Sequence, residues 1–169
     1  RDDVDESYQP LNYEMIKEAL EERFGGKWQI VIRLHNRLKK ESRSWLNLLP
    51  SYVSDATFYE DMQELLLCTD VGLTDYSSWI FDFVLSGKPG FIIELNLEDY
   101  ENARGFYYPI DTTPFPIAMN SEELAANIRK FDAEKYEKDK DVFLAARGCM
   151  EDGHASERIV EKINELMAK

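Results

Sequence analysis

The sequence predicts an α/β fold with three layers, in which an open parallel sheet carries helices on both faces. Short apolar segments with strand character alternate with segments of helical periodicity between residues 13 and 94, and this alternation is typical of parallel sheets. The chain has 169 residues, of which 44% are apolar, so it is long enough to bury a core. We therefore expect one domain that spans residues 1–169.

The first half of the chain supplies most of the predicted strands. Residues 13–24 place apolar side chains at helical spacing, and Gly25-Gly26 ends that segment. Residues 28–34 form a run rich in β-branched residues, which is typical of a buried strand. The same criteria then predict, in order, a strand at 51–54, a helix at 58–67, a strand at 70–73, a helix at 77–85 and a strand at 90–94.

The alternation ends after residue 94. Residues 100–116 are rich in aromatic residues and proline, and long loops of this kind are more often functional than idle. Helices are expected over 121–131, 136–146 and 155–167, the first of them with Ser121 as its N-cap.

Composition excludes several classes of function. The net charge of -13 disfavours nucleic acid and anionic membranes as partners, because both require basic surface. No apolar run reaches the length of about eighteen residues that a membrane span needs, and no signal peptide is present. Cys68 and Cys149 belong to no metal-ligand cluster and fit a reduced, cytosolic protein, although a disulfide between them stays open. The chain begins at Arg1 without an initiator Met, which indicates a piece of a longer protein.

Residues 74–78 (Thr-Asp-Tyr-Ser-Ser) form the most informative turn, since they link a predicted strand directly to a predicted helix. Ligands of parallel sheets bind beyond the carboxyl ends of the strands, and a helix start with added hydroxyls suits a phosphate. Thr74, Asp75, Ser77 and Ser78 are therefore candidate phosphate-binding residues. The alternative is simple capping of the helix by Asp75 or Ser77.

Three further segments carry candidate residues. His35 follows a predicted strand and could donate to a phosphate or move a proton, or it could be an ordinary loop histidine. Arg104 lies in the long loop and could pair with phosphate, while the aromatic residues beside it could instead pack that loop onto the core. At the start of the last predicted helix, Asp152 and Ser156 could hold an anion or act as caps. The sequence contains no glycine-rich dinucleotide motif, no P-loop lysine and no metal-ligand spacing.

Taken in order, these segments resemble the CDP-glycerol glycerophosphotransferases of teichoic-acid synthesis. Residues 61–66, 70–78 and 81–83 together resemble one block of that family, and residues 32–35 (Ile-Arg-Leu-His) resemble its Arg-x-His strand end. Residues 104–107 and 152–159 resemble two later blocks in the same order. Arg1-Asp2 resembles the end of the family's Pro-Thr-x-Arg-Asp block, so we expect the domain's first strand to lie outside this chain.

The resemblance implies two Rossmann-like domains that face each other across a cleft, the GT-B arrangement. This chain resembles the C-terminal domain, which binds the CDP-activated donor. The resemblance further implies that the family's N-terminal half carries a Trp-His-Gly segment whose histidine acts as the base. This chain contains no such tripeptide. The resemblance thus implies a segment that binds donor without catalysing transfer alone.

The implied reaction is attack by a hydroxyl of the growing polymer on the β-phosphate of CDP-glycerol, with release of CMP. His35 would contact the donor phosphates or act as an acid, and His35→Ala is expected to weaken donor binding without unfolding the domain. The implied donor-binding residues are Arg33, Thr74, Asp75, Ser77, Ser78, Arg104, Gly105, Asp152, Gly153 and Ser156. No metal or other cofactor is expected. The lipid-linked polymer acceptor would bind through the N-terminal half, at the cytoplasmic face of the membrane.

Alternatives remain open at this level. The donor could be CDP-ribitol or another CDP-polyol. The domain could instead belong to a GT-B glycosyltransferase that uses a sugar nucleotide, or it could be a non-catalytic nucleotide-binding module.

Overall fold

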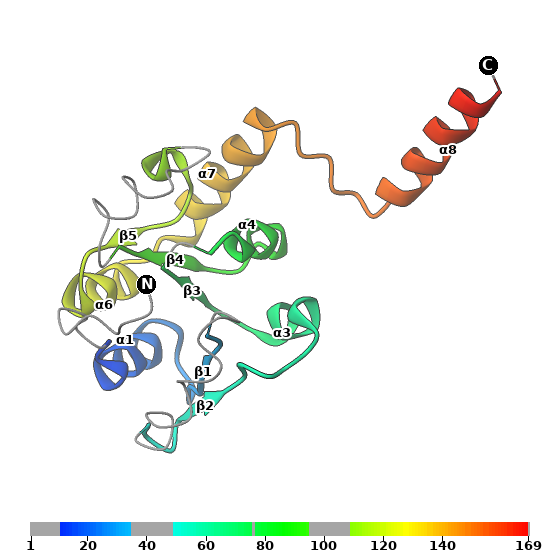
Figure 1. Cartoon of the computed structure of the whole chain (residues 1–169). Helices are drawn as coiled ribbons and strands as arrows, with labels where there is room; N and C mark the ends of the chain where they lie inside the picture. Colours follow the sequence, from blue (N-terminus) through cyan, green and yellow to red (C-terminus); the bar gives the residue numbers. More distant parts are fainter. Residues whose placement is uncertain (1–10, 35–48, 76, 95–108, 169) are drawn as a thin grey trace.

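The computed structural model describes residues 11–34, 49–75, 77–94 and 109–168 (Figure 1). The elements follow in the order α1 (Tyr13–Phe24), β1 (Ile30–Ile32), β2 (Val53–Asp55), α3 (Met62–Cys68), β3 (Gly72–Thr74), α4 (Trp79–Phe83), the 3-10 turn η2 (Val84–Ser86), β4 (Gly90–Ile93), the 3-10 turn η3 (Ile110–Thr112), β5 (Ile117–Ala118), α6 (Ser121–Arg129), α7 (Ala133–Ala146) and α8 (Ala155–Met167).

Every strand pair in the described residues is parallel, as the alternating sequence pattern predicts. β1 pairs with β2, with Ile30 opposite Val53. β4 lies between β3 and β5, with Thr74 opposite Ile92 and Ile93 opposite Ala118. The hydrogen bonds thus divide the strands into a two-stranded and a three-stranded sheet. The parallel α/β class is confirmed, and β5 is a strand that the sequence analysis missed.

Helices cover both faces of the three-stranded sheet (Figure 1). On one face, a Cβ atom built at Gly72 would lie 2.7 Å from the ring of Phe83, and one at Gly90 would lie 3.3 Å from Ile80. Both contacts are with α4. The opposite face carries Phe91, whose ring lies 5.5 Å from that of Phe131, just after α6. Helices α1 and α6 pack against each other on this second side, so the core is built between the two helical layers.

Several predicted boundaries shift for local reasons. Helix α3 begins at Met62 rather than at residue 58, because Asp61 caps it by accepting the N–H of Glu64 at 2.9 Å. Asn120, not Ser121, is the N-cap of α6 and accepts the N–H of Glu123 at 2.8 Å. The Ser121 hydroxyl instead accepts the N–H of Asn12 at 2.9 Å and joins the start of α6 to that of α1. Helix α7 begins three residues earlier than predicted.

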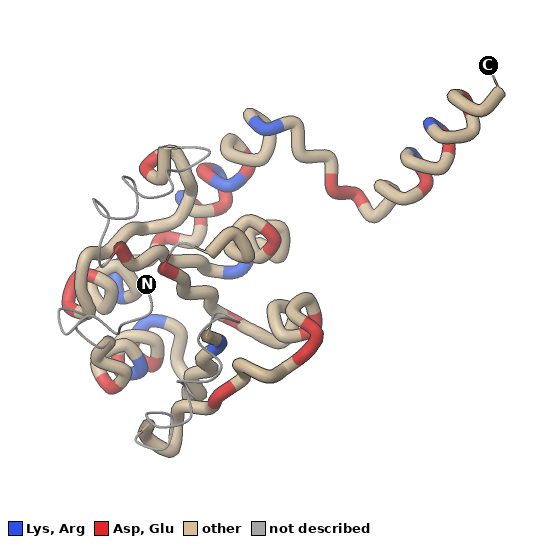
Figure 2. Tube along the Cα trace, viewed as in Figure 1, with Lys and Arg blue, Asp and Glu red and all other residues tan. Residues whose placement is uncertain are grey.

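Helix α8 stands apart from the sheet layers (Figure 1). None of its residues is buried, and its exposed apolar side chains are Ile159, Val160, Ile163, Leu166 and Met167. Acidic and basic residues alternate along it (Figure 2), and Lys162 pairs with Glu165 at 2.9 Å. Its bounds match the predicted helix over 155–167. Across the described parts of the chain, no helix is long and apolar enough to cross a lipid bilayer.

Candidate functional site

The turn after β3 is organised by Thr74. This threonine ends the strand and is buried, and its Oγ1 atom accepts the N–H of Ser77 at 3.3 Å. The N-cap of α4 is Ser78, whose side chain makes no capping hydrogen bond. The alternative, in which Asp75 or Ser77 is the N-cap, is therefore wrong. Ser77 and Ser78 are exposed, so their hydroxyls are accessible to a ligand.

The helix that follows this turn is shorter than predicted. The α-helical part comprises only Trp79–Phe83, and a 3-10 turn continues it to Ser86. So short a helix adds little dipole at its start, because a macrodipole is the sum of aligned peptide units. The groups available to an anion at this turn are hence the hydroxyls and backbone N–H groups of the turn itself.

The carboxyl ends of β1 and β2 are joined by hydrogen bonds. The Arg33 guanidinium donates to the carbonyl of Ala56 at 3.4 Å and also to that of Tyr59. The Leu34 N–H donates to the hydroxyl of the buried Thr57 at 3.1 Å. Arg33 thus holds the loop after β2, a structural contact that the sequence analysis did not assign to it. His35, Arg104 and Gly105 lie outside the described residues, and their roles stay predictions.

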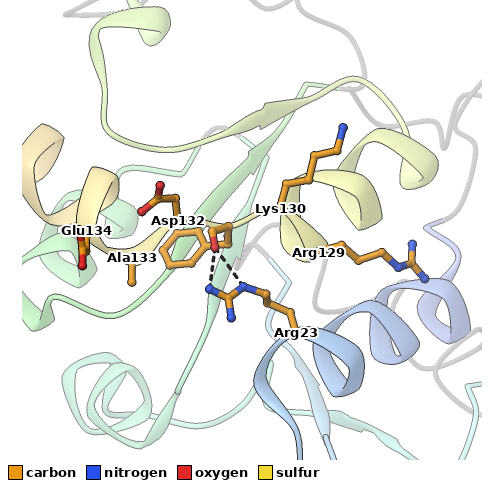
Figure 3. A pocket seen from close by; sticks show the side chains of 7 residues that line it. Arg23, Arg129, Lys130, Asp132, Ala133 and Glu134 are labelled. Atoms are coloured by element: carbon orange, nitrogen blue, oxygen red, sulfur yellow. Dashed lines mark hydrogen bonds between the residues drawn. The ribbon is translucent and has the colours of Figure 1, made fainter.

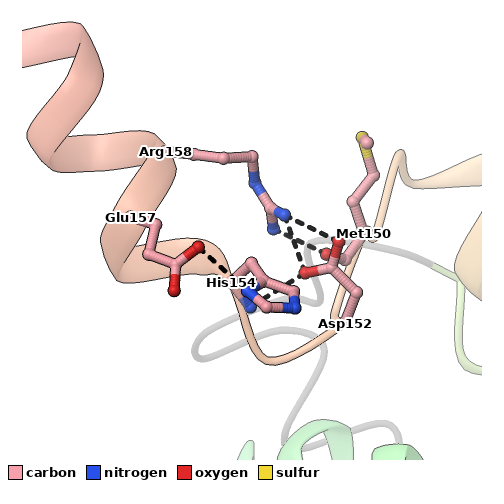
Figure 4. A network of polar contacts seen from close by, with 5 residues as sticks. All are labelled: Met150, Asp152, His154, Glu157 and Arg158. Atoms are coloured by element: carbon pink, nitrogen blue, oxygen red, sulfur yellow. Dashed lines mark hydrogen bonds and ion pairs between the residues drawn. The ribbon is translucent and has the colours of Figure 1, made fainter.

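A network of polar contacts fixes the turn before α8 (Figure 4). Arg158 holds both carboxylate oxygens of Asp152, at 2.7 and 2.8 Å, and also donates to the Met150 carbonyl. Asp152 accepts the N–H of His154 at 3.0 Å, and the His154 ring lies 3.0 Å from Glu157. His154 is the N-cap, without a side-chain capping bond. The carboxylate of Asp152 is therefore engaged within its own turn.

The described structure does not bring all predicted site residues together. Thr74, Ser77 and Ser78 share one turn at the sheet, whereas Asp152, Gly153 and Ser156 lie at the start of α8, away from it (Figure 1). Gly153 has φ of 83°, a conformation that glycine adopts without strain. The donor-binding role of this second group stays a prediction.

The ion pair at this turn gives a testable pH response. The hydrogen bond from Arg158 holds the pKa of the Asp152 carboxyl below its ordinary value. We expect Arg158→Gln to raise that pKa toward the ordinary aspartate value, as measured by NMR titration. Because the folded pKa is lowered, the pair stabilises the turn above the unfolded pKa, and this contribution is lost as pH falls through the folded pKa. An unchanged Asp152 titration in Arg158→Gln would contradict the assignment, and Lys162→Gln on the same helix is the control.

A hollow of about 580 Å³ lies where α1 and α6 end (Figure 3). Both of its arginines have structural roles: Arg23 donates to the Phe131 carbonyl at 3.0 and 2.8 Å, and Arg129 pairs with Glu22. Helix α6 starts just after β5, so its end lies toward the amino ends of the strands. The hollow is thus a packing feature of the helix ends, on the side away from the Thr74 turn.

Glu94 is a candidate that the sequence analysis passed over. It directly follows β4, is only 3% exposed, and its N–H donates to the Ala118 carbonyl at 2.7 Å. The sequence places it at the end of an apolar strand, which gives no sign that its side chain is buried. Within the described ranges, no group of three or more His, Cys, Asp or Glu residues is placed to hold a metal ion.

The fold and the turn define the chain as a parallel α/β domain with polar groups at the carboxyl ends of its strands, the edge where ligands of such sheets bind. The family model of the CDP-Glycerol:Poly(glycerophosphate) glycerophosphotransferases matches residues 1–165. The chain belongs to this family, and the resemblance seen in the sequence is confirmed.

Named relatives agree with this assignment. The chain is 35% identical over 146 residues to the teichoic acid poly(ribitol-phosphate) polymerase of Bacillus spizizenii, covering 78% of this chain and 23% of that protein. It is 32% identical over 161 residues to the teichoic acid glycerol-phosphate transferase of Staphylococcus aureus, covering 93% of this chain and 40% of the relative. The chain therefore spans less than half the length of these relatives.

Solved structures share the fold. A structure of the wall teichoic acid polymerase TagF superposes with a TM-score of 0.66 at 25% identity, over 95% of this chain and 40% of that chain. A second TagF structure, a histidine-to-asparagine variant soaked with CDPG, gives a TM-score of 0.67 at 26% identity over 91% of this chain and 38% of that chain.

Proposed function

We propose that this chain is the donor-binding domain of a transferase that moves glycerol phosphate from CDP-glycerol to a teichoic-acid-like polymer, with release of CMP. The observation that carries the proposal is the Thr74 turn, where a buried threonine holds a turn that exposes two serine hydroxyls in a member of this family. The soak of the similar TagF with CDPG supports a cytidine nucleotide as the ligand.

In the proposed reaction an acceptor hydroxyl attacks the β-phosphorus of the donor. The new P–O bond forms as the bond from that phosphorus to the bridging oxygen breaks, and CMP leaves with that oxygen. The acceptor proton passes to a base that we place in the other half of the longer protein. This domain contributes hydrogen bonds to the phosphoryl oxygens, since positioning and electrostatic stabilisation dominate phosphoryl transfer. Ser77 and Ser78 would donate from the turn, and Arg33, Asp75 and His35 are further proposed contacts of the donor.

A second group of residues is proposed to contact the nucleotide. Arg104 and Gly105 in the long loop, and Asp152, Gly153 and Ser156 before α8, would line the nucleotide pocket. We propose a metal-independent reaction and a cytoplasmic enzyme, peripheral to the inner membrane face, whose lipid-linked acceptor binds the other half. The segment alone would bind donor and not transfer it.

A ribitol donor is the second candidate, because relatives of both kinds match the chain. The teichoic acid ribitol-phosphate primase of Bacillus spizizenii is 29% identical over 94% of this chain, close to the value for the glycerol-phosphate transferase. The two donors share the cytidine diphosphate group and differ only in the polyol. Affinity for the polyol is therefore the property that separates them.

Titration calorimetry with CDP-glycerol, CDP-ribitol, CDP and a UDP-sugar tests the proposal. We expect the cytidine nucleotides to bind and the UDP-sugar not to bind. Binding of the UDP-sugar alone would instead favour a sugar-nucleotide glycosyltransferase. A folded chain that binds none of the four would favour an interaction module.

Thr74→Val links that binding to the turn. The valine keeps the shape of threonine but removes the acceptor of the Ser77 N–H, so we expect CDP-glycerol affinity to fall by about tenfold, the effect of one lost hydrogen bond. The matched control is Thr113→Val, whose hydroxyl donates to the Ile110 carbonyl at 2.6 Å, away from the strand end. Equal affinities for the wild type and Thr74→Val would remove the turn from the site.

A further inference from the structure

Glu94 occupies an unusual place for a carboxylate. It extends the central strand β4 by one residue, and its N–H still pairs with the Ala118 carbonyl of β5 at 2.7 Å. Its side chain is 3% exposed. A buried carboxylate needs hydrogen-bond partners, and Glu94 has this need at the edge of the sheet where ligands of parallel sheets bind. This position makes Glu94 a candidate for function.

Strand alternation identifies the face on which Glu94 lies. Side chains two residues apart share a face, so Gly90, Ile92 and Glu94 lie on one side of β4. Added Cβ atoms at Gly90 and Gly72 would both meet side chains of α4, so this is the face that α4 covers. Thr74 lies directly opposite Ile92 in the parallel register and on the same face. Glu94 therefore lies two residues beyond the level of Thr74, at the carboxyl end of the sheet and on the face that α4 covers.

The chemistry of a carboxylate limits what it can bind at this place. An ionised carboxylate only accepts hydrogen bonds, and it repels a phosphate. A partner next to a phosphate-binding turn must therefore be a donor, and the hydroxyl groups of a nucleotide-activated polyol are donors. We propose that Glu94 is a specificity-determining residue that accepts a hydrogen bond from a hydroxyl of the donor. This inference rests on the proposed function and adds the residue that recognises the uncharged part of the ligand.

The test replaces the carboxylate by an amide of the same shape. Calorimetry with CDP-glycerol and with CMP is run on the wild type, on Glu94→Gln and on Tyr136→Phe. Tyr136 is the matched control, because its hydroxyl is also buried but its ring packs against Phe131 and Phe115, away from the strand end. We expect Glu94→Gln to lose about tenfold or more in CDP-glycerol affinity, as for a hydrogen bond to a charged group, with an unchanged melting temperature. Tyr136→Phe should keep the wild-type affinity.

The CMP measurement locates the hydroxyl. An equal loss for CMP and CDP-glycerol places the accepted hydroxyl on the ribose, and a loss for CDP-glycerol alone places it on the polyol. Equal affinity in the wild type and Glu94→Gln overturns the proposal. If Glu94→Gln does not fold, Glu94→Asp decides: wild-type affinity overturns the proposal, and weaker binding with a wild-type melting temperature supports it. A wild type that binds neither ligand would contradict the proposed function itself.

Discussion

Leu124→Ala is expected to lower the free energy of unfolding by about 2–5 kcal/mol, the range for truncating a fully buried leucine. Leu124 is 0% exposed and lies in α6, the helix that packs against α1. The truncation removes apolar contacts and leaves a cavity, because close-packed surroundings relax only partly. Urea unfolding followed by circular dichroism measures the loss.

The same substitution on α8 supplies the control. Leu166 is 60% exposed and also lies inside a helix, so Leu166→Ala changes the same atoms without opening a cavity. We expect its effect on the urea midpoint to lie within about 0.5 kcal/mol, as for surface substitutions. Similar losses in the two variants would mean that α8 is packed as firmly as α6, contrary to the described structure.

Gly72→Ala is expected to destabilise the domain and to disturb the candidate site together. The added Cβ would lie 2.7 Å from two ring carbons of Phe83, a residue that is only 1% exposed and cannot retreat into solvent. Overpacking of this kind costs about 1–3 kcal/mol. To relieve this clash, α4 must move away from the sheet. The Ser77 and Ser78 hydroxyls, which lie just before α4, would move with it. We therefore expect a lower free energy of unfolding in denaturant and a weaker affinity for CDP-glycerol in calorimetry.

Gly26→Ala separates the two effects. Gly26 has φ of 74° and no atom within 4 Å of a built Cβ, so alanine there introduces backbone strain of about 1–2 kcal/mol but no clash. It lies between α1 and β1, at the amino end of a strand and outside the proposed binding residues. We expect some loss of stability and unchanged ligand affinity. If Gly72→Ala also left the affinity intact, α4 would not position the turn.

The sequence correctly predicted those helices whose ends depend on residues within or next to the helix itself. Helix α1 matches the predicted bounds because Gly25 ends it with φ of 73°. The parallel class followed from the alternation of strand and helix segments. The cap of α6 was misplaced by one residue, since Asn120 and Ser121 are both good caps and only the contact from Ser121 to Asn12 decides between them. Strand β5 has two residues, too few for a periodic pattern.

The part of the candidate site that could be predicted consists of polar residues that directly follow a strand in the sequence. Thr74, Ser77 and Ser78 follow a strand directly, so their place at its carboxyl end could be inferred. The burial of the Glu94 side chain could not be inferred, because the sequence alone does not show which parts of the fold cover it. The pairing of Asp152 with Arg158 spans six residues across a turn, and helical spacing does not foresee such a pair.

The isolation of α8 has a thermodynamic consequence. A helix of 13 residues is marginal in water when it buries nothing, because nucleation is costly and only local pairs offset it. Its helix–coil equilibrium is then governed by its own residues, such as the Lys162–Glu165 pair, and not by the cooperative unfolding of the core. The backbone amides of α8 would exchange with solvent through local opening, while those of β3 and β4 would await opening of the whole domain.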